Sequence, residues 1–412
     1  MTLVICVVLV ALAFEYVNGF HDTANAIATS VATKVLTPAQ AIVLSAFGNL
    51  VGALMGTAVA KTIGQGLVET QFVTSITIMS ALIGAITWNL FTWWIGLPSS
   101  SSHALIGGLA GATLASAGGQ WTAIKWISTK TKIVSQLIPA PKEVVQAVSQ
   151  AGFGPGTTNN YTLGTNHIQV VMPDDTAGQI LLVTTRAITE HGGIWHKVVK
   201  PMFMAPLCGL IVGFVIMGLL LILLRRMRPK VVNTFFGRMQ LLSAGWMSYE
   251  HGRNDAQKTM GIIALTLFAA TTQSHVFDHL PPLLGFLRTP TFDIALWVKV
   301  VCAITIAAGT AAGGWKIIKT MGKNVVRMQP IHGFAAQTTA ASVIGVATHF
   351  GIPLSTTHVI SGSIMGVGAT KRLNAVKWGV AERMLWAWVL TIPISGALSY
   401  GTMRLLMLFG HH

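Results

Sequence analysis

Residues 19–25 read Gly-Phe-His-Asp-Thr-Ala-Asn, and this polar stretch lies inside an apolar segment that extends from residue 3 to residue 35. An ionisable side chain at membrane depth is costly, so it usually marks a path for a substrate or an ion. Asp22 therefore indicates a functional site inside an apolar segment.

Both this stretch and a second motif occur twice in the chain. Residues 252–258 read Gly-Arg-Asn-Asp-Ala-Gln-Lys, and Asp255 follows Asp22 by 255 − 22 = 233 residues. Residues 96–107 and 351–362 both contain Pro-x-Ser-(Ser/Thr)-(Ser/Thr)-His. The two motifs occur in the same order in each half, so the sequence predicts an internal duplication.

The composition is that of a membrane protein. Of the 412 residues 52% are hydrophobic and 9% are charged, whereas a soluble domain carries roughly 25% charged residues. Apolar runs of about 20 residues recur along the chain, and a transmembrane β-barrel would alternate instead. We expect an all-α membrane protein, a polytopic helical bundle of about 10–12 helices with broken helices and two re-entrant hairpins. By analogy with other duplicated transporters, the two repeats are expected to be inverted.

The net charge of +15 is attributed to a bias toward basic cytoplasmic loops. Nucleic-acid binding would need a basic domain outside the membrane. The longest polar stretch, residues 118–200, has mixed charge, so no nucleic-acid partner is expected. The three cysteines lie in apolar runs and are interpreted as small core residues. They therefore predict no disulfide or metal framework.

Four regions are predicted along the chain. They are a first repeat at 1–117, a polar insert at 118–200, a span with a basic cytoplasmic linker at 201–232, and a second repeat at 233–412. The first hairpin lies in the first repeat and the second hairpin in the second repeat. Apolar stretches 104–117 and 359–367 are too short to cross a membrane alone, and each is therefore expected to be re-entrant.

Several local features are predicted inside these regions. Asn18 and Gly19 are expected to break the first helix, with its second half starting near Asp22. A second break is expected at Pro393 in the final helix. In the insert the predictions are a helix within 122–150, a turn at 152–156 and strands at 167–172 and 179–184.

The hydroxyl motifs are suited to holding an anion. Ser and Thr cap helix starts, and a helix N-terminus offers free N–H groups and a positive dipole end. For a single copy, capping alone is the better interpretation. Two copies in register favour a cage for a tetrahedral oxyanion. The predicted anion-binding residues are Ser100, Ser101, Ser102, Ser355, Thr356 and Thr357.

The paired acids predict a role for cations. Two carboxylates beside an anion repel in a low dielectric, so protons, sodium or a divalent metal must enter with it. The predicted cation-coupling residues are Asp22, Asn25, Asn254, Asp255 and Gln337. His21, His103 and His358 are expected either to relay protons or to donate to backbone carbonyls. Lys258 replaces the Asn25 of the first motif, and pairing with Asp255 is preferred to contact with the anion.

At these motifs the sequence resembles the inorganic phosphate transporter family (PiT), especially its bacterial low-affinity members. The likeness covers most of the chain except residues 118–190. It implies cation-coupled phosphate uptake across the bacterial inner membrane, with inverted repeats and paired hairpins. Proton or sodium would be the coupling ion, no cofactor is implied, and phosphate and membrane lipid are the expected partners. A metal–phosphate substrate and a homo-oligomer stay open. Arg253 departs from the alanine usual in the family, and predicts an added anion contact or altered coupling.

Three other functions are weighed. A channel stays open, and uptake against a gradient that an uncoupler collapses would exclude it. A permease for sulfate or another oxyanion would use the same helix N-termini. An intramembrane hydrolase would need Asp22, His103 and a serine of residues 99–102. That reading is disfavoured, because adjacent residues on a helix point apart and a single-site enzyme has no use for the duplication. The chain is therefore not expected to be an enzyme.

Overall fold

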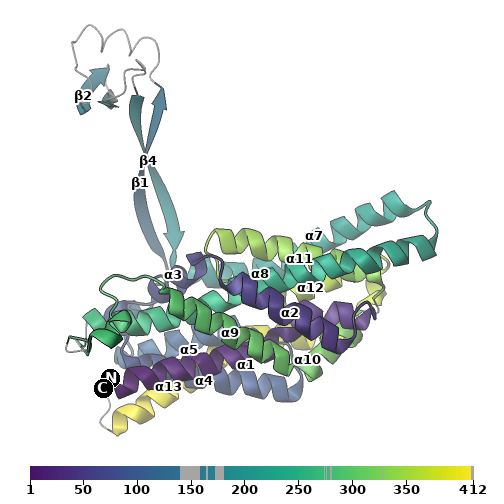
Figure 1. Cartoon of the computed structure of the whole chain (residues 1–412), viewed down its shortest axis with the longest axis horizontal. Coiled ribbons are helices and arrows are strands. Elements are labelled where there is room, and N and C mark those ends of the chain that lie inside the picture. Colours follow the sequence, from purple (N-terminus) through teal and green to yellow (C-terminus); the bar gives the residue numbers. More distant parts are fainter. Residues whose placement is uncertain are drawn as a thin grey trace. The chain divides into compact units, whose positions relative to one another are not determined.

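The structure is a computed structural model of the 412-residue chain. It describes residues 1–139, 158–163, 166–171, 181–272, 274, 276–278, 281–326 and 328–409. Contacts divide the chain into two compact units, residues 1–126 with 193–412 and residues 127–192. The first unit is helical and the second contains a sheet (Figure 1).

The helical unit has two series of helices. Those before the basic linker are α1 (Thr2–Ala32), α2 (Pro38–Ala53), α3 (Ala58–Gln65), α4 (Ser75–Ile95), α5 (Ser101–Ser116) and α7 (Lys200–Leu224). Those after it are α8 (Pro229–Thr272), α9 (Leu296–Ala312), α10 (Trp315–Lys319), α11 (Pro330–His349), α12 (Thr356–Ala369) and α13 (Trp378–Leu408). Short 3₁₀ or π turns occur at η1 (Thr70–Phe72), η2 (Trp121–Ala123), η3 (Trp195–Val199), η4 (Pro282–Leu287), η5 (Thr320–Asn324) and η6 (Leu373–Ala375).

Several of these helices are long and apolar enough to cross a membrane. Within the described residues there are 4 by length and composition, or up to 6 if each of two bent pairs is one span. The four are Thr2–Ala32, Ser75–Ile95, Trp195–Leu224 and Trp378–Leu408. The bent pairs are α2 with α3 at 71° and α9 with the segment Trp315–Gly322 at 63°, and each is a broken span or a re-entrant loop.

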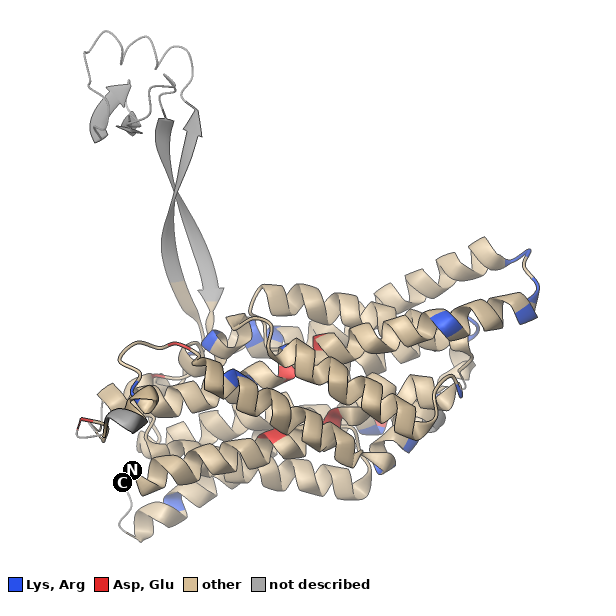
Figure 2. Ribbon diagram, in the orientation of Figure 1, with Lys and Arg blue, Asp and Glu red and all other residues tan. Residues whose placement is uncertain are grey.

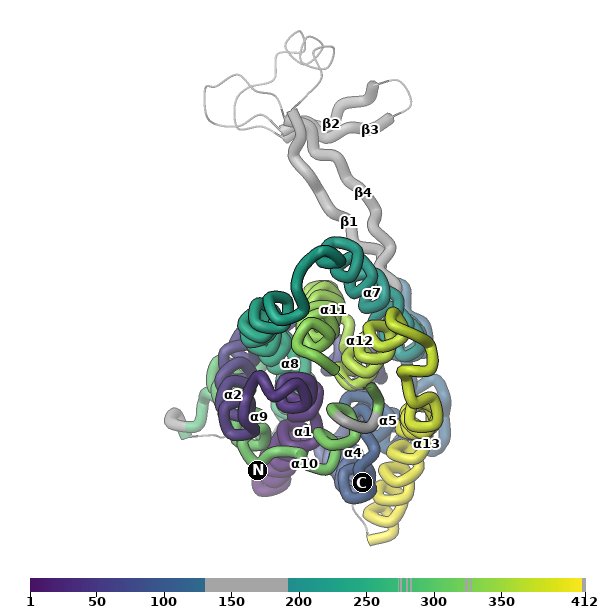
Figure 3. The backbone as a smooth tube through the Cα atoms, turned by 90° about the vertical axis from the view of Figure 1, so that its right-hand side faces the viewer, coloured from purple at the N-terminus to yellow at the C-terminus, as the bar shows by residue number. Residues whose placement is uncertain are grey.

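The packing of the second series repeats that of the first. Helix α1 packs on α4 and α9, and α8 packs on α11 and α2. Helix α5 packs against α4 and α13, and α12 packs against α11 and α7. In Figure 3, α7 and α13 lie on the outside of the bundle, beside α12 and α5 respectively. The duplicated motifs thus lie on helices with matching neighbours.

The two helices that carry the acidic motifs run in opposite directions. Helix α1 starts at the end of the bundle marked N in Figure 1, and α8 starts at the other end, where it joins α7. That join contains four exposed basic residues, Arg225, Arg226, Arg228 and Lys230, and the ribbon is blue there (Figure 2).

Glycines let the helices of the two series touch backbone to backbone. A Cβ on Gly19 of α1 would lie 2.5 Å from the carbonyl oxygen of Ile306 in α9, and Gly309 of α9 abuts the Tyr16 carbonyl. In the same way Gly52 of α2 abuts the backbone of α8, and Gly252 of α8 abuts the backbone of α2. Small residues permit this approach in membranes, where apolar burial gives little drive between helices.

Two predicted helix breaks are wrong. Helix α1 is continuous through Asn18 and Gly19, because Gly19 serves the crossing with α9 and not a turn. Helix α13 is continuous through Pro393. Proline is tolerated inside membrane helices because neighbouring helices and hydroxyl side chains compensate the lost backbone bond.

The second unit contains an antiparallel sheet of order β1-β4-β3-β2. Its strands are β1 (Ser128–Pro139), β2 (Thr158–Leu163), β3 (Asn166–Val171) and β4 (Leu181–Gly192). The last two fall on the two predicted strands. The helix predicted within 122–150 is wrong over β1, where β-branched residues alternate with polar ones and favour a strand. Residues 140–150 and the turn predicted at 152–156 lie outside the described residues.

Candidate functional site

The starts of α5 and α12 have the same cap. The Ser100 hydroxyl accepts from the backbone N–H of His103 at 3.2 Å, and the Ser355 hydroxyl accepts from that of His358 at 3.3 Å. Both serines are buried. A capped first turn leaves its remaining N–H groups free and keeps the positive end of the helix fixed. The capping interpretation therefore holds for these two side chains.

The four other predicted hydroxyls are also buried, and those of Ser102, Thr356 and Thr357 meet polar groups from the other series of helices. Asn25 of α1 donates its side-chain amide to the hydroxyls of Thr356 at 3.0 Å and Thr357 at 2.9 Å. The Thr357 hydroxyl lies 3.5 Å from an Asp22 carboxylate oxygen. The Ser101 hydroxyl lies 3.5 Å from the His21 ring. The first acidic motif therefore contacts the starts of both α5 and α12.

The second acidic motif lies against the same helix starts. The Thr356 hydroxyl donates to Asp255 at 3.0 Å. The side-chain amide of Asn254 donates to the other oxygen of Asp255 and to the Leu354 carbonyl, both at 2.8 Å. Residues from all four duplicated motifs thus converge at one place, as the sequence predicted for Asp22 and Asp255.

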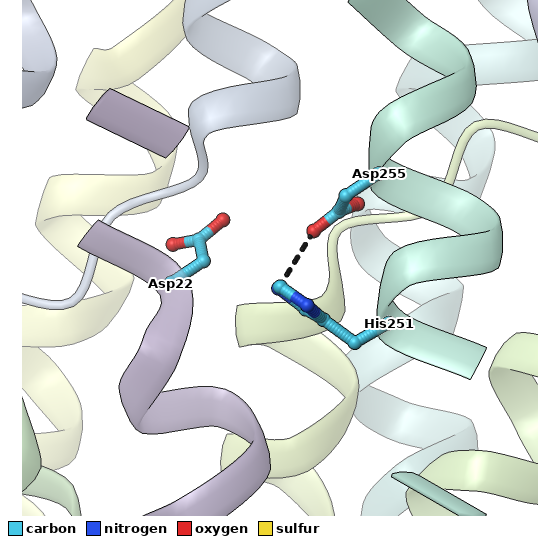
Figure 4. A group of neighbouring side chains, drawn as sticks. All are labelled: Asp22, His251 and Asp255. Atoms are coloured by element: carbon cyan, nitrogen blue, oxygen red, sulfur yellow. Dashed lines mark ion pairs between the residues drawn. The ribbon is translucent and has the colours of Figure 1, made fainter. Parts of the chain in front are cut away.

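The two acids approach one another with a histidine between them. Asp22, His251 and Asp255 point together from α1 and α8 (Figure 4), and one ligand atom from each lies within 4.8 Å of the others. The Nε2 atom of His251 is 3.1 Å from Asp255. All three are buried, and two carboxylates this close repel in a low dielectric. Carboxylate oxygens and an imidazole nitrogen are ligands that a cation would accept here.

Lys258 pairs with Asp255, as the sequence predicted. Its ammonium also contacts the Ser102 hydroxyl and the Leu354 carbonyl, the latter at 2.9 Å. The lysine side chain is only 2% exposed. A buried ammonium needs such partners, because an unpaired charge in this position would be very costly.

The three candidate histidines separate into two groups. His21 joins the site, with Nδ1 2.8 Å from Asp22 and Nε2 3.1 Å from the Thr92 hydroxyl. His103 and His358 instead meet each other edge to face at 4.7 Å, and His358 stacks on Trp388 at 4.1 Å. No hydrogen bond joins either of these two rings to Asp22 or Asp255 in the part of the chain that the structure describes.

Gln337 holds helices together beside the site. Its amide nitrogen donates to the Ala26 carbonyl at 2.9 Å and to the Ser30 hydroxyl at 3.0 Å, and its oxygen accepts from Ser243 at 3.0 Å. These contacts join α11 to α1 and α8. In this conformation the amide thus fixes the helices around Asn25.

Arg253 does not face the hydroxyls. Its guanidinium pairs with Glu250 at 3.2 Å, in a pocket of about 500 Å³ between α8 and α11. The anion contact or altered coupling expected of Arg253 stays a prediction, and in this conformation the pairing with Glu250 favours neither an anion contact nor a contact with the hydroxyl motifs. Arg253 and Asn254 are adjacent on α8, so their side chains leave the helix in different directions.

Sequence reasoning missed the roles of His251 and Asn49, whereas interhelical hydrogen bonding is the preferred role for Thr92 and is present between α4 and α1. His251 precedes Asp255 by four residues, a spacing that places both on one helix face and was the available signal. Its Nδ1 lies 2.9 Å from the Asn49 side-chain oxygen of α2. Thr92 and Ser99 hydrogen-bond to each other at 2.8 Å and both approach His21. No repeated motif marks Asn49 or Thr92, so their place in the site follows only from the packing of α2 and α4.

These features define a class. Two hydroxyl-bearing helix starts and two buried acids converge inside a duplicated helical membrane protein, an arrangement suited to passing an ionic solute. Residues 18–144 and 225–399 match the phosphate transporter family PHO4, and the chain belongs to that family. Its activity is accordingly transport and not catalysis. Membership and the apolar helices place the chain in the bacterial inner membrane.

Individual relatives agree with this assignment. The chain is 38% identical over 403 residues to a probable low-affinity inorganic phosphate transporter of Bacillus subtilis, covering 97% of this chain and 96% of that protein. It is 39% identical to a protein of the same description from Mycobacterium leprae, covering 99% of this chain and 79% of that one. A solved structure described as the sodium-dependent phosphate transporter has the same fold, with a TM-score of 0.66, 21% identity and coverage of 99% and 100%.

Proposed function

We propose that this protein takes up inorganic phosphate by symport with protons or sodium. The observation that carries the proposal is the convergence of both series of helices on one buried place. Asn25 of α1 donates to Thr356 and Thr357 of α12, and Thr356 donates to Asp255 of α8. Such a site needs an anion to use its donors and a cation to balance its acids.

The phosphate would be held by neutral donors. We assign its binding to the helix starts with Ser100, Ser101, Ser102, Ser355, Thr356 and Thr357. Ser100 and Ser355 act through their caps, which fix the N–H groups that face the anion. The other four offer hydroxyls. Thr356 and Thr357 share the Asn25 amide, Ser101 lies near the His21 ring and Ser102 lies near the Leu354 carbonyl, which supports one shared site for a small ligand.

The cation would bind near the acids. Asp22 and Asp255 supply charge, Asn25 and Asn254 orient the carboxylates and hydroxyls, and Gln337 fixes α1 beside them. His21 is the histidine in position to carry a proton to Asp22. The opposite directions of α1 and α8 support inverted repeats, whose relative motion would expose the site to each side in turn.

Phosphate is favoured over sulfate by the same acids. Near neutral pH phosphate still carries a proton that a carboxylate accepts, whereas sulfate does not. Relatives described as inorganic phosphate transporters support the same choice. The cluster of Asp22, His251 and Asp255 would also suit a metal–phosphate complex as the transported substrate. The experiment below tests this by comparing uptake with and without magnesium.

The test is uptake of labelled phosphate by proteoliposomes of the purified chain. Proton and sodium gradients are imposed separately, with and without magnesium, and unlabelled sulfate is the competitor. We expect concentrative uptake driven by one of the two gradients and little competition by sulfate. Two results would contradict the proposal. One is uptake driven by the phosphate gradient alone, and the other is inhibition by unlabelled sulfate as strong as inhibition by unlabelled phosphate.

A further inference from the structure

Lys258 has every donor of its ammonium occupied. An ammonium has three N–H donors and no acceptor. In the structure Nζ contacts three oxygen atoms, from the Asp255 carboxylate, the Ser102 hydroxyl and the Leu354 carbonyl. The side chain is buried, so water does not compete for these donors. The ammonium is therefore committed to these three oxygens in this conformation.

The three oxygens are of the kinds that bind a hard cation. One is a carboxylate, one a hydroxyl and one a backbone carbonyl, and they come from α8, α5 and the segment just before α12. Carboxylate and carbonyl oxygens coordinate hard cations in proteins, and unwound segments next to half-helices supply carbonyls to coupling ions in transporters. The ammonium thus fills an oxygen site that a sodium-like cation would suit.

The corresponding place in the first motif has no such charge. Asn25 follows Asp22 by three residues, as Lys258 follows Asp255, and its neutral amide donates to Thr356 and Thr357. Asp22 pairs with His21 at 2.8 Å. Within the described residues no lysine or arginine forms an ion pair with Asp22. The two acidic sites are therefore alike in position and unlike in charge.

We propose that Lys258 is a built-in cation, whose ammonium permanently occupies the cation position beside Asp255. The inference rests on the proposed function and adds to it an account of coupling. The transported cation then binds only beside Asp22. If both acidic sites bound a transported cation, each phosphate would be accompanied by one more positive charge than we propose. Because its donors are all used, Lys258 stabilises Asp255 and does not hold the anion.

The test is the variant Lys258→Asn, which copies Asn25. Proteoliposomes are held at a series of membrane potentials, and the potential at which net phosphate flux stops gives the charge moved with each phosphate. We expect the variant to move one more positive charge for each phosphate than the unaltered chain. Uptake should also depend more steeply on cation concentration. The matched control is Lys61→Asn, which removes an exposed lysine of α3 and should leave the stopping potential unchanged.

Other results would overturn the inference. An unchanged stopping potential with a higher KM for phosphate would make Lys258 a ligand of the anion. An unchanged potential and an unchanged KM would make it a structural partner of Asp255 only.

A second measurement covers a variant that folds poorly. Thermal unfolding of the purified protein in detergent is compared in sodium chloride and choline chloride, without phosphate. Lys258→Asn should gain a sodium-dependent rise in Tm that the unaltered chain lacks or shows less strongly. Equal instability in both salts would overturn the inference. This readout needs no transport, so it tests Lys258 even if the unaltered chain moves no phosphate and the proposed function fails.

Discussion

The acidic motifs of α1 and α8 occupy matching places in the fold, but their carboxylates have different neighbours. Asp22 contacts a histidine and a threonine hydroxyl, whereas Asp255 contacts an ammonium, an imidazole, an amide and a threonine hydroxyl. The hydroxyl motifs did not diverge in this way, since Ser100 and Ser355 make the same cap. The duplication therefore kept the same capped helix starts, while the charges beside the two acids became different.

The largest difference between the acidic motifs of α1 and α8 should be in how much each aspartate contributes to the stability of the protein. Asp255→Asn leaves Lys258 buried without its carboxylate, and breaking a buried pair costs about 3–5 kcal/mol. Asp22→Asn leaves no lysine unpaired and should lower the Tm of the protein in detergent far less. The double change Asp255→Asn with Lys258→Met should recover much of the loss. Equal losses from the two single changes would show that the motifs are not specialised.

Transport should show the next largest effect. Asp22→Asn removes the carboxylate assigned to the transported cation. We expect phosphate uptake in proteoliposomes to fall about 100-fold, which corresponds to about 2.7 kcal/mol. Asp293→Asn is the matched control, because Asp293 is exposed and, among the described residues, accepts a hydrogen bond from the backbone of Ile294 alone. Near-normal gradient-driven uptake by Asp22→Asn would remove that residue from the coupling site.

The same capped helix starts predict equal and smaller effects at the two caps. Ser100→Ala and Ser355→Ala should each lower the free energy of unfolding by about 1 kcal/mol, because each removes one N-cap. Ser100→Gly and Ser355→Gly are the matched controls, and each should lower the free energy of unfolding by only a few tenths of a kcal/mol. Thermal unfolding in detergent measures all four variants. A large difference between the α5 and α12 caps would break the likeness on which the comparison depends.

The smallest effect is expected at Arg253, the other basic residue of the second motif. Arg253→Ala should leave the KM for phosphate within about twofold, less than 0.5 kcal/mol, because the guanidinium pairs with Glu250 and not with the hydroxyls. Any loss of stability should be recovered in part by Glu250→Gln, which removes the unpaired carboxylate. A tenfold rise in KM, measured by uptake, would bring Arg253 into the anion site.

The parts of the site that were predictable share one property, which is that they are repeated. Asp22, Asp255 and the two hydroxyl motifs stand out because each has a copy, and the structure brings them together. His251 and Asn49 have no matching copy, and their meeting depends on the crossing of α2 and α8. Sequence spacing cannot predict such a crossing, because the crossing depends on how closely the backbones of two helices approach.

The errors in the fold have a related cause. Glycine and proline signal breaks in water, where a freed backbone group finds a solvent partner. Inside the bundle Gly19 provides room for α9, and α13 continues through Pro393. In the insert, the pattern of residues 128–139 fits a strand better than the helix that was expected. Propensity rules for soluble turns therefore misplaced boundaries but kept the number and order of the main helices.

The glycine crossings carry a consequence for biosynthesis. Gly19 meets α9 and Gly52 meets α8, so α1 and α2 each make a glycine crossing with a helix of the second series. As the ribosome releases the chain, α1 and α2 enter the membrane long before those partners exist. The glycine surfaces of α1 and α2 face lipid until α8 and α9 are inserted. These two crossings therefore form between the repeats, after the second repeat has entered the membrane.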